Sequence, residues 1–189
     1  MSNEQGNVLL PLARAAIAQA LNVPLTAEET APWLSEWGAC FVTLTQYGEL
    51  RGCIGTLQAY RSLREDVKHN AVAAALRDPR FAPLSAQELN ITDIEISLLS
   101  PTQKIAFINE ADALAQLRPG LDGVVFEYGH HRSTFLPQVW EQIPQAKQFM
   151  AQLKRKAGLQ DNFWAEGVNL SRYSVTKWHE KENSHGRAH

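Results

Sequence analysis

Two β-rich runs separated by one turn signal limit the folds open to this chain, in the stretch "GACFVTLTQYGELRGCIGTL". Tyr47 and Gly48 stand between the runs, where a two-residue turn would join two antiparallel strands. The capping box Ser62–Glu65 follows, and the small apolar residues after it are spaced as on one face of a helix. The pattern predicts a β-hairpin packed against a long helix that ends before Pro79.

The rest of the chain predicts further helices and strands in alternation. The first helix should carry Pro11 in its first turn, where a missing N–H costs little. Strands between helices predict an α+β fold, with a largely antiparallel sheet and flanking helices. The predicted elements are helices at residues 7–22, 109–117 and 144–157, helical turns at Thr26–Glu29 and Ser85–Glu88, strands at residues 91–100 and 168–180, and paired strands at residues 121–129 and 131–138.

The composition is that of an ordinary globular protein. With 189 residues, 44% of them apolar and 20% charged, the chain can bury a sizeable core. Its formal net charge of −2 argues against a general attraction to nucleic acid or to an anionic membrane. No basic leading segment or bilayer-long apolar run is present, so we expect a cytoplasmic protein with two free thiols. We assign one domain to residues 8–180, with room for a small second lobe, and a flexible tail to residues 181–189.

The hairpin turn sets which residues of the two strands share a face. If Tyr47 and Gly48 are the whole turn, paired residue numbers sum to 95, so that Cys53 faces Val42 and Arg51 faces Leu44. Cys53, Arg51 and Cys40 then share one face, while Gly52 and Ile54 lie on the other with Phe41 and Thr43. A shift of one residue would instead separate the cysteines onto opposite faces. In either register a Cys40–Cys53 disulfide is poorly supported.

Two glycines flank Cys53 inside its strand, where glycine usually marks a bulge or a close approach by another group. One interpretation is functional: Gly52 and Gly55 leave the thiol unshielded, and Arg51 favours a thiolate or holds an anionic ligand. Cys53 is then a candidate nucleophile. The other interpretation is structural, with a packed cysteine under the alanine-rich helix and glycines that make room for it. The residues alone leave both open.

Two charged residues later in the chain are further candidates for ligand binding. Arg80 belongs to the motif "DPRF", which either presents an Asp/Arg pair to a site or ends the preceding helix by satisfying backbone groups. Glu95 stands among apolar strand residues and needs a partner if it faces inward, for which Arg51 or Arg80 is the natural choice.

The remaining candidates carry weaker signals. Gln138 could hydrogen-bond a ligand, and Lys156 could hold an anion, although the cluster Lys154–Lys156 also suits the end of a helix. His69 should point away from the sheet, so a Cys53–His69 dyad is not expected. His130–His131 fits a solvated turn, and no nucleotide-binding or metal-binding motif occurs, so we predict no cofactor and no metal site.

The stretch "LRGCIGT" is unusual, and further motifs follow it in a fixed order. In this combination the chain resembles the AMMECR family, named in prokaryotes AmmeMemoRadiSam system protein A, over residues 8–180. The resemblance implies a two-lobed α+β fold with a cleft. The other matching motifs are "GACFVTL", "DPRF", "EISLLS", "FLPQVW", "KAGL" and "RYSVTKWHE". The site residues that it implies are Arg51, Gly52, Cys53, Ile54 and Gly55.

The family resemblance also implies partners. It associates the protein with a Memo-type protein, itself similar to extradiol dioxygenases, and with a radical SAM protein. We expect a small anionic ligand or substrate at the LRGCIG strand, with covalent chemistry at Cys53 as one form of this hypothesis. The alternative is an adaptor for the Memo-type partner without chemistry of its own. A nucleic-acid-binding regulator is a weaker hypothesis, which only Lys154–Lys156 supports.

Overall fold

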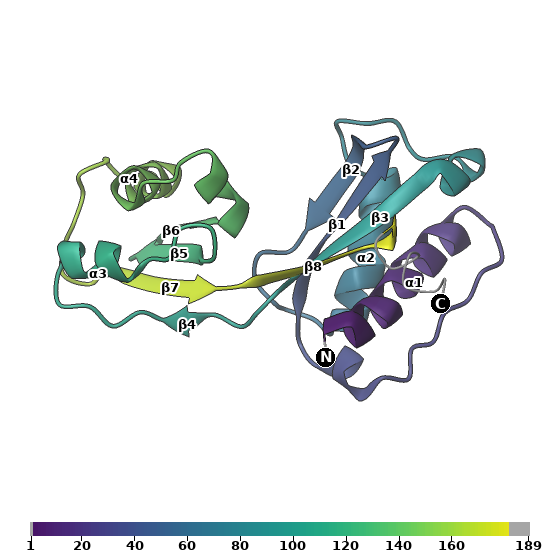
Figure 1. Ribbon diagram of the computed structural model, residues 1–189, viewed down its shortest axis with the longest axis horizontal. Coiled ribbons are helices and arrows are strands. Elements are labelled where there is room, and N and C mark those ends of the chain that lie inside the picture. The colour runs from purple at the N-terminus through teal and green to yellow at the C-terminus, as the bar shows by residue number, and fades with distance from the viewer. Residues whose placement is uncertain (1, 182–189) are drawn as a thin grey trace. The chain divides into compact units, whose positions relative to one another are not determined.

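The predicted β-hairpin forms one edge of a four-stranded sheet in the computed structural model, which describes residues 2–181 (Figure 1). β1 (Ala39–Gln46) and β2 (Glu49–Gly55) are antiparallel. Tyr47 and Gly48 join them with φ angles of 53° and 81°, the left-handed backbone that a two-residue hairpin turn requires. The hairpin and its turn are therefore confirmed.

β3 (Thr92–Leu99) and β8 (Val175–His179) complete this sheet, sheet 1, in the order β2–β1–β3–β8. α1 (Ser2–Ala20) and α2 (Leu63–Leu76) pack on one of its faces (Figure 1). Ser62 caps α2 with its side chain, as the capping box predicts. The core between the helices and the sheet includes Leu9, Leu12, Ile17, Val42, Leu44, Val67, Ala71, Ala74, Ile94, Ile96 and Trp178.

α1 begins at Ser2, so Pro11 lies inside the helix, and its predicted place in the first turn is wrong. Pro11 is exposed, so water can hydrate the carbonyl group that loses its N–H partner. The turns before it are held by packing, because a Cβ at Gly6 would lie 2.5 Å from the indole ring of Trp178. This close approach to β8 extends the helix past the proline.

The helical turn predicted at Thr26–Glu29 is wrong, because no helix occurs between α1 and η1 (Pro32–Ser35). The carboxylate of Glu29 accepts a hydrogen bond of 2.7 Å from Lys68, and its carbonyl oxygen accepts one of 2.9 Å from Arg64. These contacts with α2 use the glutamate that the capping box would need, and they hold the segment extended.

A second four-stranded sheet, sheet 2, has the order β4–β7–β5–β6, where we had predicted one sheet for the whole chain. The paired strands and the two helices predicted here are confirmed. The elements are β4 (Gln103–Lys104), α3 (Glu110–Gln116), β5 (Gly123–Tyr128), β6 (His131–Phe135), η3 (Pro137–Glu141), α4 (Ala146–Lys156) and β7 (Asn169–Tyr173). The core of this part includes Val124, Phe126, Trp140, Phe149, Met150, Leu153 and Leu170. The α+β class is confirmed.

The closing strand predicted at residues 168–180 is two strands, β7 in sheet 2 and β8 in sheet 1. At the break, Ser174 donates its N–H to the hydroxyl of Ser100 at 2.8 Å and accepts the N–H of Ser100 at 2.9 Å. The chain forms two compact units: unit 1 contains the residues up to Leu99 and those from Thr176 on, and unit 2 contains Ser100–Val175. Apart from Lys181, the predicted flexible tail lies outside the described residues.

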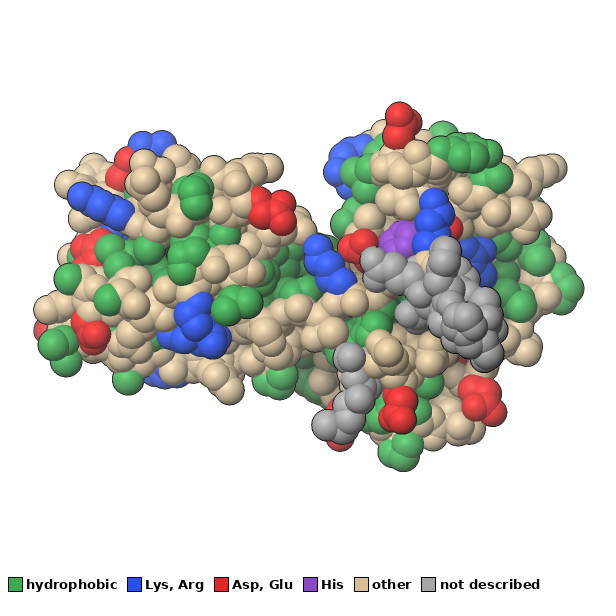
Figure 2. Space-filling view, in the orientation of Figure 1, with side chains coloured by type: hydrophobic (Ala, Val, Ile, Leu, Met, Phe, Trp, Pro, Cys, Tyr) green, Lys and Arg blue, Asp and Glu red, His purple; other side chains and the backbone are tan. Residues whose placement is uncertain are grey.

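Within residues 2–181, no helix has both the length and the apolar composition that a membrane span requires. On the face that Figure 2 displays, basic and acidic side chains are interspersed with hydrophobic and neutral ones. This mixture agrees with the formal net charge of −2.

Candidate functional site

A β-bulge in the hairpin changes the face on which Cys53 lies. Near the turn the pairing follows the predicted register, but beyond Arg51 it shifts by one residue, so that Cys53 pairs with Thr43 and not with Val42. One extra residue in one strand reverses the faces of all residues beyond it. The predicted grouping of Cys53 with Cys40 is therefore wrong.

The two cysteines are free and lie on opposite faces of sheet 1. Cys40 is fully buried on the helix side, and burial, followed by the charge of Asp66, raises the pKa of its thiol well above the ordinary value. Ile54 also packs against the core on this side. Cys53 is half-buried on the other face, which we call the outer face. The outer face also carries Thr43, Glu95 and Lys177.

The two glycines of the strand are explained by close packing. A Cβ at Gly52 would lie 2.2 Å from the carbonyl oxygen of Ala74, so α2 approaches the sheet with its backbone. A Cβ at Gly55 would lie 2.2 Å from the ring of Phe41. The glycines thus make room for the backbone of α2 and for Phe41, and not for a cysteine packed under the helix, as the structural interpretation had it.

Asp78 and Arg80 bind the main chain of Cys53 at the edge of the sheet. Cys53 donates its N–H to Asp78 at 3.0 Å, and its carbonyl oxygen accepts from Arg80 at 3.4 Å. The two side chains also pair with each other at 2.8 Å. The Arg80 hydrogen bond, followed by the Cys53 N–H, holds the pKa of Asp78 well below its ordinary range. The DPRF motif thus satisfies the edge of β2, and it fixes the backbone that carries the thiol.

Arg51 is engaged away from the thiol, contrary to the predicted grouping. Its guanidinium pairs with Glu88 at 3.2 Å. Glu88 belongs to the capping box of η2 (Ala86–Ile91), which is confirmed, and it also accepts from Gln46 at 3.0 Å. Within residues 2–181, Nη1 of Arg51 is the one buried side-chain nitrogen or oxygen without a partner. The cation beside Cys53 is Arg80, whose side chain is 55% exposed.

Glu88 makes the stability of unit 1 depend on pH. The hydrogen bond from Gln46, followed by that from Arg51, lowers the pKa of its carboxyl from 4.5 to about 2. The folded state therefore binds this proton more weakly than the unfolded chain. The stabilisation is complete above about pH 5 and is lost as the pH falls through the range from 4.5 to about 2.

We expect Glu88→Gln to flatten the acid limb of the stability curve. Between pH 7 and pH 3 the wild type should lose about 1 kcal/mol more than the variant, since solvent screens the partly exposed pair. Urea unfolding at several pH values measures this difference. Glu141→Gln, at an exposed position in unit 2, is the control and should follow the wild type. Parallel curves for wild type and Glu88→Gln would contradict the assignment.

The outer face carries a transverse row of polar groups. Thr43 pairs with Cys53 on one side and with Glu95 on the other. Its hydroxyl lies 3.3 Å from the sulfur of Cys53, and Nζ of Lys177 lies 3.9 Å from the carboxylate of Glu95. The predicted pairing of Glu95 with Arg51 or Arg80 is therefore wrong, because the strand directs Glu95 to the outer face. A thiol, a hydroxyl, a carboxylate and an ammonium group follow one another across the sheet.

The other two predicted ligand residues, Gln138 and Lys156, belong to unit 2. Gln138 is exposed in η3, and Lys156 at the end of α4 donates to the carbonyl oxygen of Thr134 at 2.8 Å. Lys154 lies in the last turn of α4, as predicted, and its side chain is buried and donates to Glu110 at 2.7 Å.

The histidines lie where the sequence predicts. His69 is exposed on α2, away from the sheet, so it forms no dyad with Cys53. His130 lies in the turn of the β5–β6 hairpin, while His131 begins β6, and its Nδ1 lies 2.8 Å from the carbonyl oxygen of Ala157. In the described part of the chain, no three His, Cys, Asp or Glu side chains are grouped as metal ligands.

A buried polar network behind the hairpin was missed. The carboxylate of Asp66 is fully buried and accepts from the N–H of Cys40 at 2.8 Å, the hydroxyl of Thr56 at 2.7 Å and Nε of Arg61 at 2.8 Å. Asn70 donates to the carbonyl oxygen of Cys40 at 3.0 Å. The signal in the sequence is that Asp66 and Asn70 stand four residues apart, on one side of the helix and next to the predicted buried face.

Fold and site together define an α+β protein of two antiparallel sheets, with a half-buried thiol on an edge strand. The AMMECR1 family model matches residues 10–178. The chain therefore belongs to the AMMECR1 family, as the LRGCIGT motif predicts.

Similar proteins occur in archaea. Over 188 residues the chain is 35% identical to Protein MJ0810 of Methanocaldococcus jannaschii, covering 95% of this chain and 92% of that protein. It is 33% identical over 190 residues to a protein of Methanothermobacter thermautotrophicus, covering 95% and 96%. The crystal structure of the uncharacterized protein PH0010 from Pyrococcus horikoshii is similar with a TM-score of 0.76 and 31% identity, covering 94% of this chain and 92% of that one.

Proposed function

We propose that the outer face of sheet 1 binds a small acidic molecule beside Cys53, and that the thiol contacts the bound molecule. The row of Cys53, Thr43, Glu95 and Lys177 carries the proposal. Arg80 stands beside the main chain of Cys53, and Lys177 is exposed at the other end of the row. Cations at both ends of a row that contains a thiol, a hydroxyl and a carboxylate suit a ligand with a carboxylate or another anionic group.

Contacts with neighbouring residues fix the backbone around Cys53, as a binding site requires. Asp78 and Arg80 fix both main-chain polar groups of the residue, and Gly52 sets the strand against α2. Thr43 can donate its hydroxyl to the sulfur once the thiol proton has left for solvent. A site residue supported by such contacts keeps its geometry without help from the ligand.

The family resemblance supports a role for this ligand in a shared pathway. We propose that a Memo-type protein and a radical SAM protein act in the same pathway on the bound molecule.

A second candidate function is a binding module for the Memo-type partner. The observation that favours it concerns the thiol: among the hydrogen bonds of the described residues, Sγ of Cys53 has one side-chain partner, the hydroxyl of Thr43, and no histidine or carboxylate. A nucleophile normally has a general base within reach. If the thiol is inert, we expect native mass spectrometry to find a complex with the Memo-type protein.

Alkylation of the native protein separates the two functions. With iodoacetamide at pH 7.5 we expect Cys53 to be labelled and Cys40 to be protected until the protein unfolds, as read by peptide mass mapping. Arg80→Gln should change the labelling rate of Cys53 by a factor of about 2 to 5, because Arg80 holds the carbonyl group of Cys53 and orients Asp78, which accepts its N–H. Small dicarboxylates should protect the thiol.

The control for Arg80→Gln is Arg64→Gln, which removes the same charge from α2. It should leave the labelling rate of Cys53 unchanged. If Cys53 is labelled no faster than Cys40, or if acidic molecules give no protection, the small-ligand function is wrong and the binding module takes its place.

A further inference from the structure

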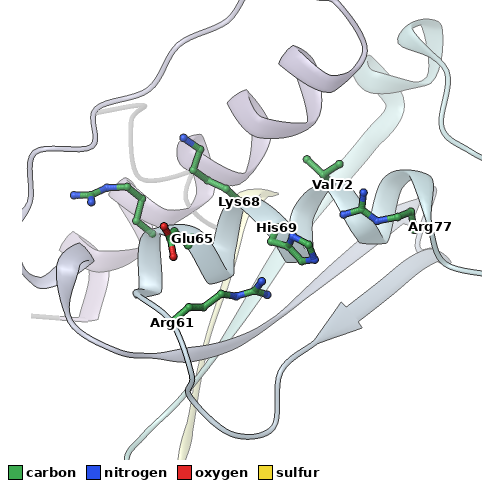
Figure 3. Close-up of a pocket in the computed structure, with 7 residues that line it drawn as sticks. Arg61, Glu65, Lys68, His69, Val72 and Arg77 are labelled. Atoms are coloured by element: carbon green, nitrogen blue, oxygen red, sulfur yellow. The ribbon is translucent and has the colours of Figure 1, made fainter.

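A hollow lined by basic side chains lies along the exposed side of α2 (Figure 3). Its volume is about 610 Å³, inside the range of roughly 300–1,000 Å³ that small-molecule sites occupy. It is separate from the outer face, because α2 covers the opposite face of sheet 1. The polar side chains that line it are Arg61, Arg64, Glu65, Lys68, His69 and Arg77.

Arg61 and Arg77 bring two positive charges close to His69. Figure 3 shows the guanidinium groups of Arg61 and Arg77 directed toward the ring of His69 from opposite sides. Partial burial, followed by the charges of Arg61 and Arg77, lowers the pKa of His69, and the charge of Asp66 acts in the opposite direction. A cluster of like charges destabilises itself, and a bound anion relieves that repulsion.

Arg61 is held in place before any ligand arrives. Its Nε donates to the buried carboxylate of Asp66 at 2.8 Å, and its Nη2 lies 3.3 Å from the side-chain oxygen of Asn70. The side chain is 15% exposed. A guanidinium has five N–H donors, so these two bonds leave others for a ligand. A donor fixed in this way loses little conformational entropy on binding.

The other cations of the hollow differ in how far they are neutralised. Lys68 pairs with Glu29 at 2.7 Å, and Arg64 donates to the carbonyl oxygen of Glu29. In the described part of the chain no ion pair or side-chain hydrogen bond is found for Arg77. Its charge is thus the one most available to an anion.

We propose that this hollow binds a small molecule through a phosphate group held by Arg61, His69 and Arg77. A phosphate presents oxygens in several directions and can accept from donors on different sides, whereas a carboxylate has two oxygens in one plane. The basic groups are confined to one stretch of one unit, and the formal net charge is −2. These features favour a compact phosphorylated molecule over a nucleic-acid backbone.

The ring signals of His69 report directly on this site. We expect inorganic phosphate and pyrophosphate to shift them saturably, with pyrophosphate binding more tightly, and to raise the pKa of His69, because a nearby anion stabilises the imidazolium form. His69→Asn identifies the signals by removing them. The measurement is a pH titration by NMR with each anion and with chloride at equal ionic strength.

Two variants that each remove one positive charge, one in the hollow and one in unit 2, test whether the binding is specific. Arg77→Gln should weaken pyrophosphate binding about tenfold or more, which is the loss of one charge-assisted contact. In the free protein it should also raise the pKa of His69, since a repelling charge is gone. Lys147→Gln, at an exposed position in unit 2, should change neither.

Three results would overturn the proposal. The first is that the His69 signals respond to pyrophosphate no more than to chloride. The second is that Lys147→Gln weakens binding as much as Arg77→Gln, which would mean unspecific charge attraction. The third is that a single-stranded oligothymidylate binds through Arg77 more tightly than pyrophosphate, which would assign the hollow to nucleic acid.

Discussion

Gly52→Ala should destabilise the protein by about 3 kcal/mol, because its methyl group would enter space held by the backbone of α2. A Cβ at this position would lie 2.2 Å from the carbonyl oxygen of Ala74, far inside the contact distance of a carbon and an oxygen atom that are not bonded. A backbone oxygen cannot rotate away, so either β2 or the whole helix must move. Urea unfolding followed by circular dichroism measures the change in the free energy of unfolding.

The matched comparison is Gly55→Ala in the same strand. Here the new methyl group meets the ring of Phe41 at 2.2 Å, and a side chain can shift where a backbone cannot. We expect this variant to cost about 1–3 kcal/mol and the double variant Gly55→Ala/Phe41→Ala to show a favourable coupling between the two sites. If Gly52→Ala costs no more than Gly55→Ala, then α2 does not approach the sheet through its backbone.

The effect of Gly52→Ala should also reach the proposed site. Cys53 follows Gly52 directly, and its main chain is bound by Asp78 and Arg80 from the segment after α2. A helix displaced from β2 carries that segment with it. Labelling of Cys53 in this variant should therefore change even under conditions in which the protein stays folded.

Local signals explain which parts of the fold were predictable. The turn at Tyr47–Gly48 and the caps at Ser62 and Ser85 depend on residues within a few positions, and all three are confirmed. The predictions fail where a residue far away in the sequence determines the local structure. Packing on Trp178 lets α1 begin several residues before Pro11, and the hydrogen bond from Lys68 to Glu29 prevents the predicted helical turn.

The bulge at Arg51 was not predicted, and this omission had the largest effect on the prediction of the site. Strand periodicity is two, so one extra residue moved Cys53 to the outer face and away from Cys40. Arg51 is held by Glu88, a residue far along the chain, and no pattern within the hairpin records that contact. The sequence thus indicated the strand that carries the thiol, but not which cation lies beside it.

Asp66→Ala should destabilise unit 1 by about 3–5 kcal/mol, the cost of removing one partner of a buried ion pair. The substitution leaves the N–H of Cys40 and the hydroxyl of Thr56 without their acceptor and Arg61 without its counter-ion. All three groups are bonded to α2 through that carboxylate, while Asn70 adds a contact to Arg61 and one to the hydroxyl of Thr56. Asp66→Asn keeps the shape and one acceptor oxygen, so it should cost less than the alanine variant.

Glu65→Ala is the control, since Glu65 is exposed on the same turn of α2 and is also acidic. It loses a favourable interaction with the helix N-terminus, so we expect a cost below about 1 kcal/mol. The order Asp66→Ala, Asp66→Asn, Glu65→Ala, from largest to smallest loss of unfolding free energy, distinguishes a buried network from a helix-end charge effect. Equal losses for Asp66→Ala and Glu65→Ala would mean that the carboxylate of Asp66 does not join α2 to the hairpin.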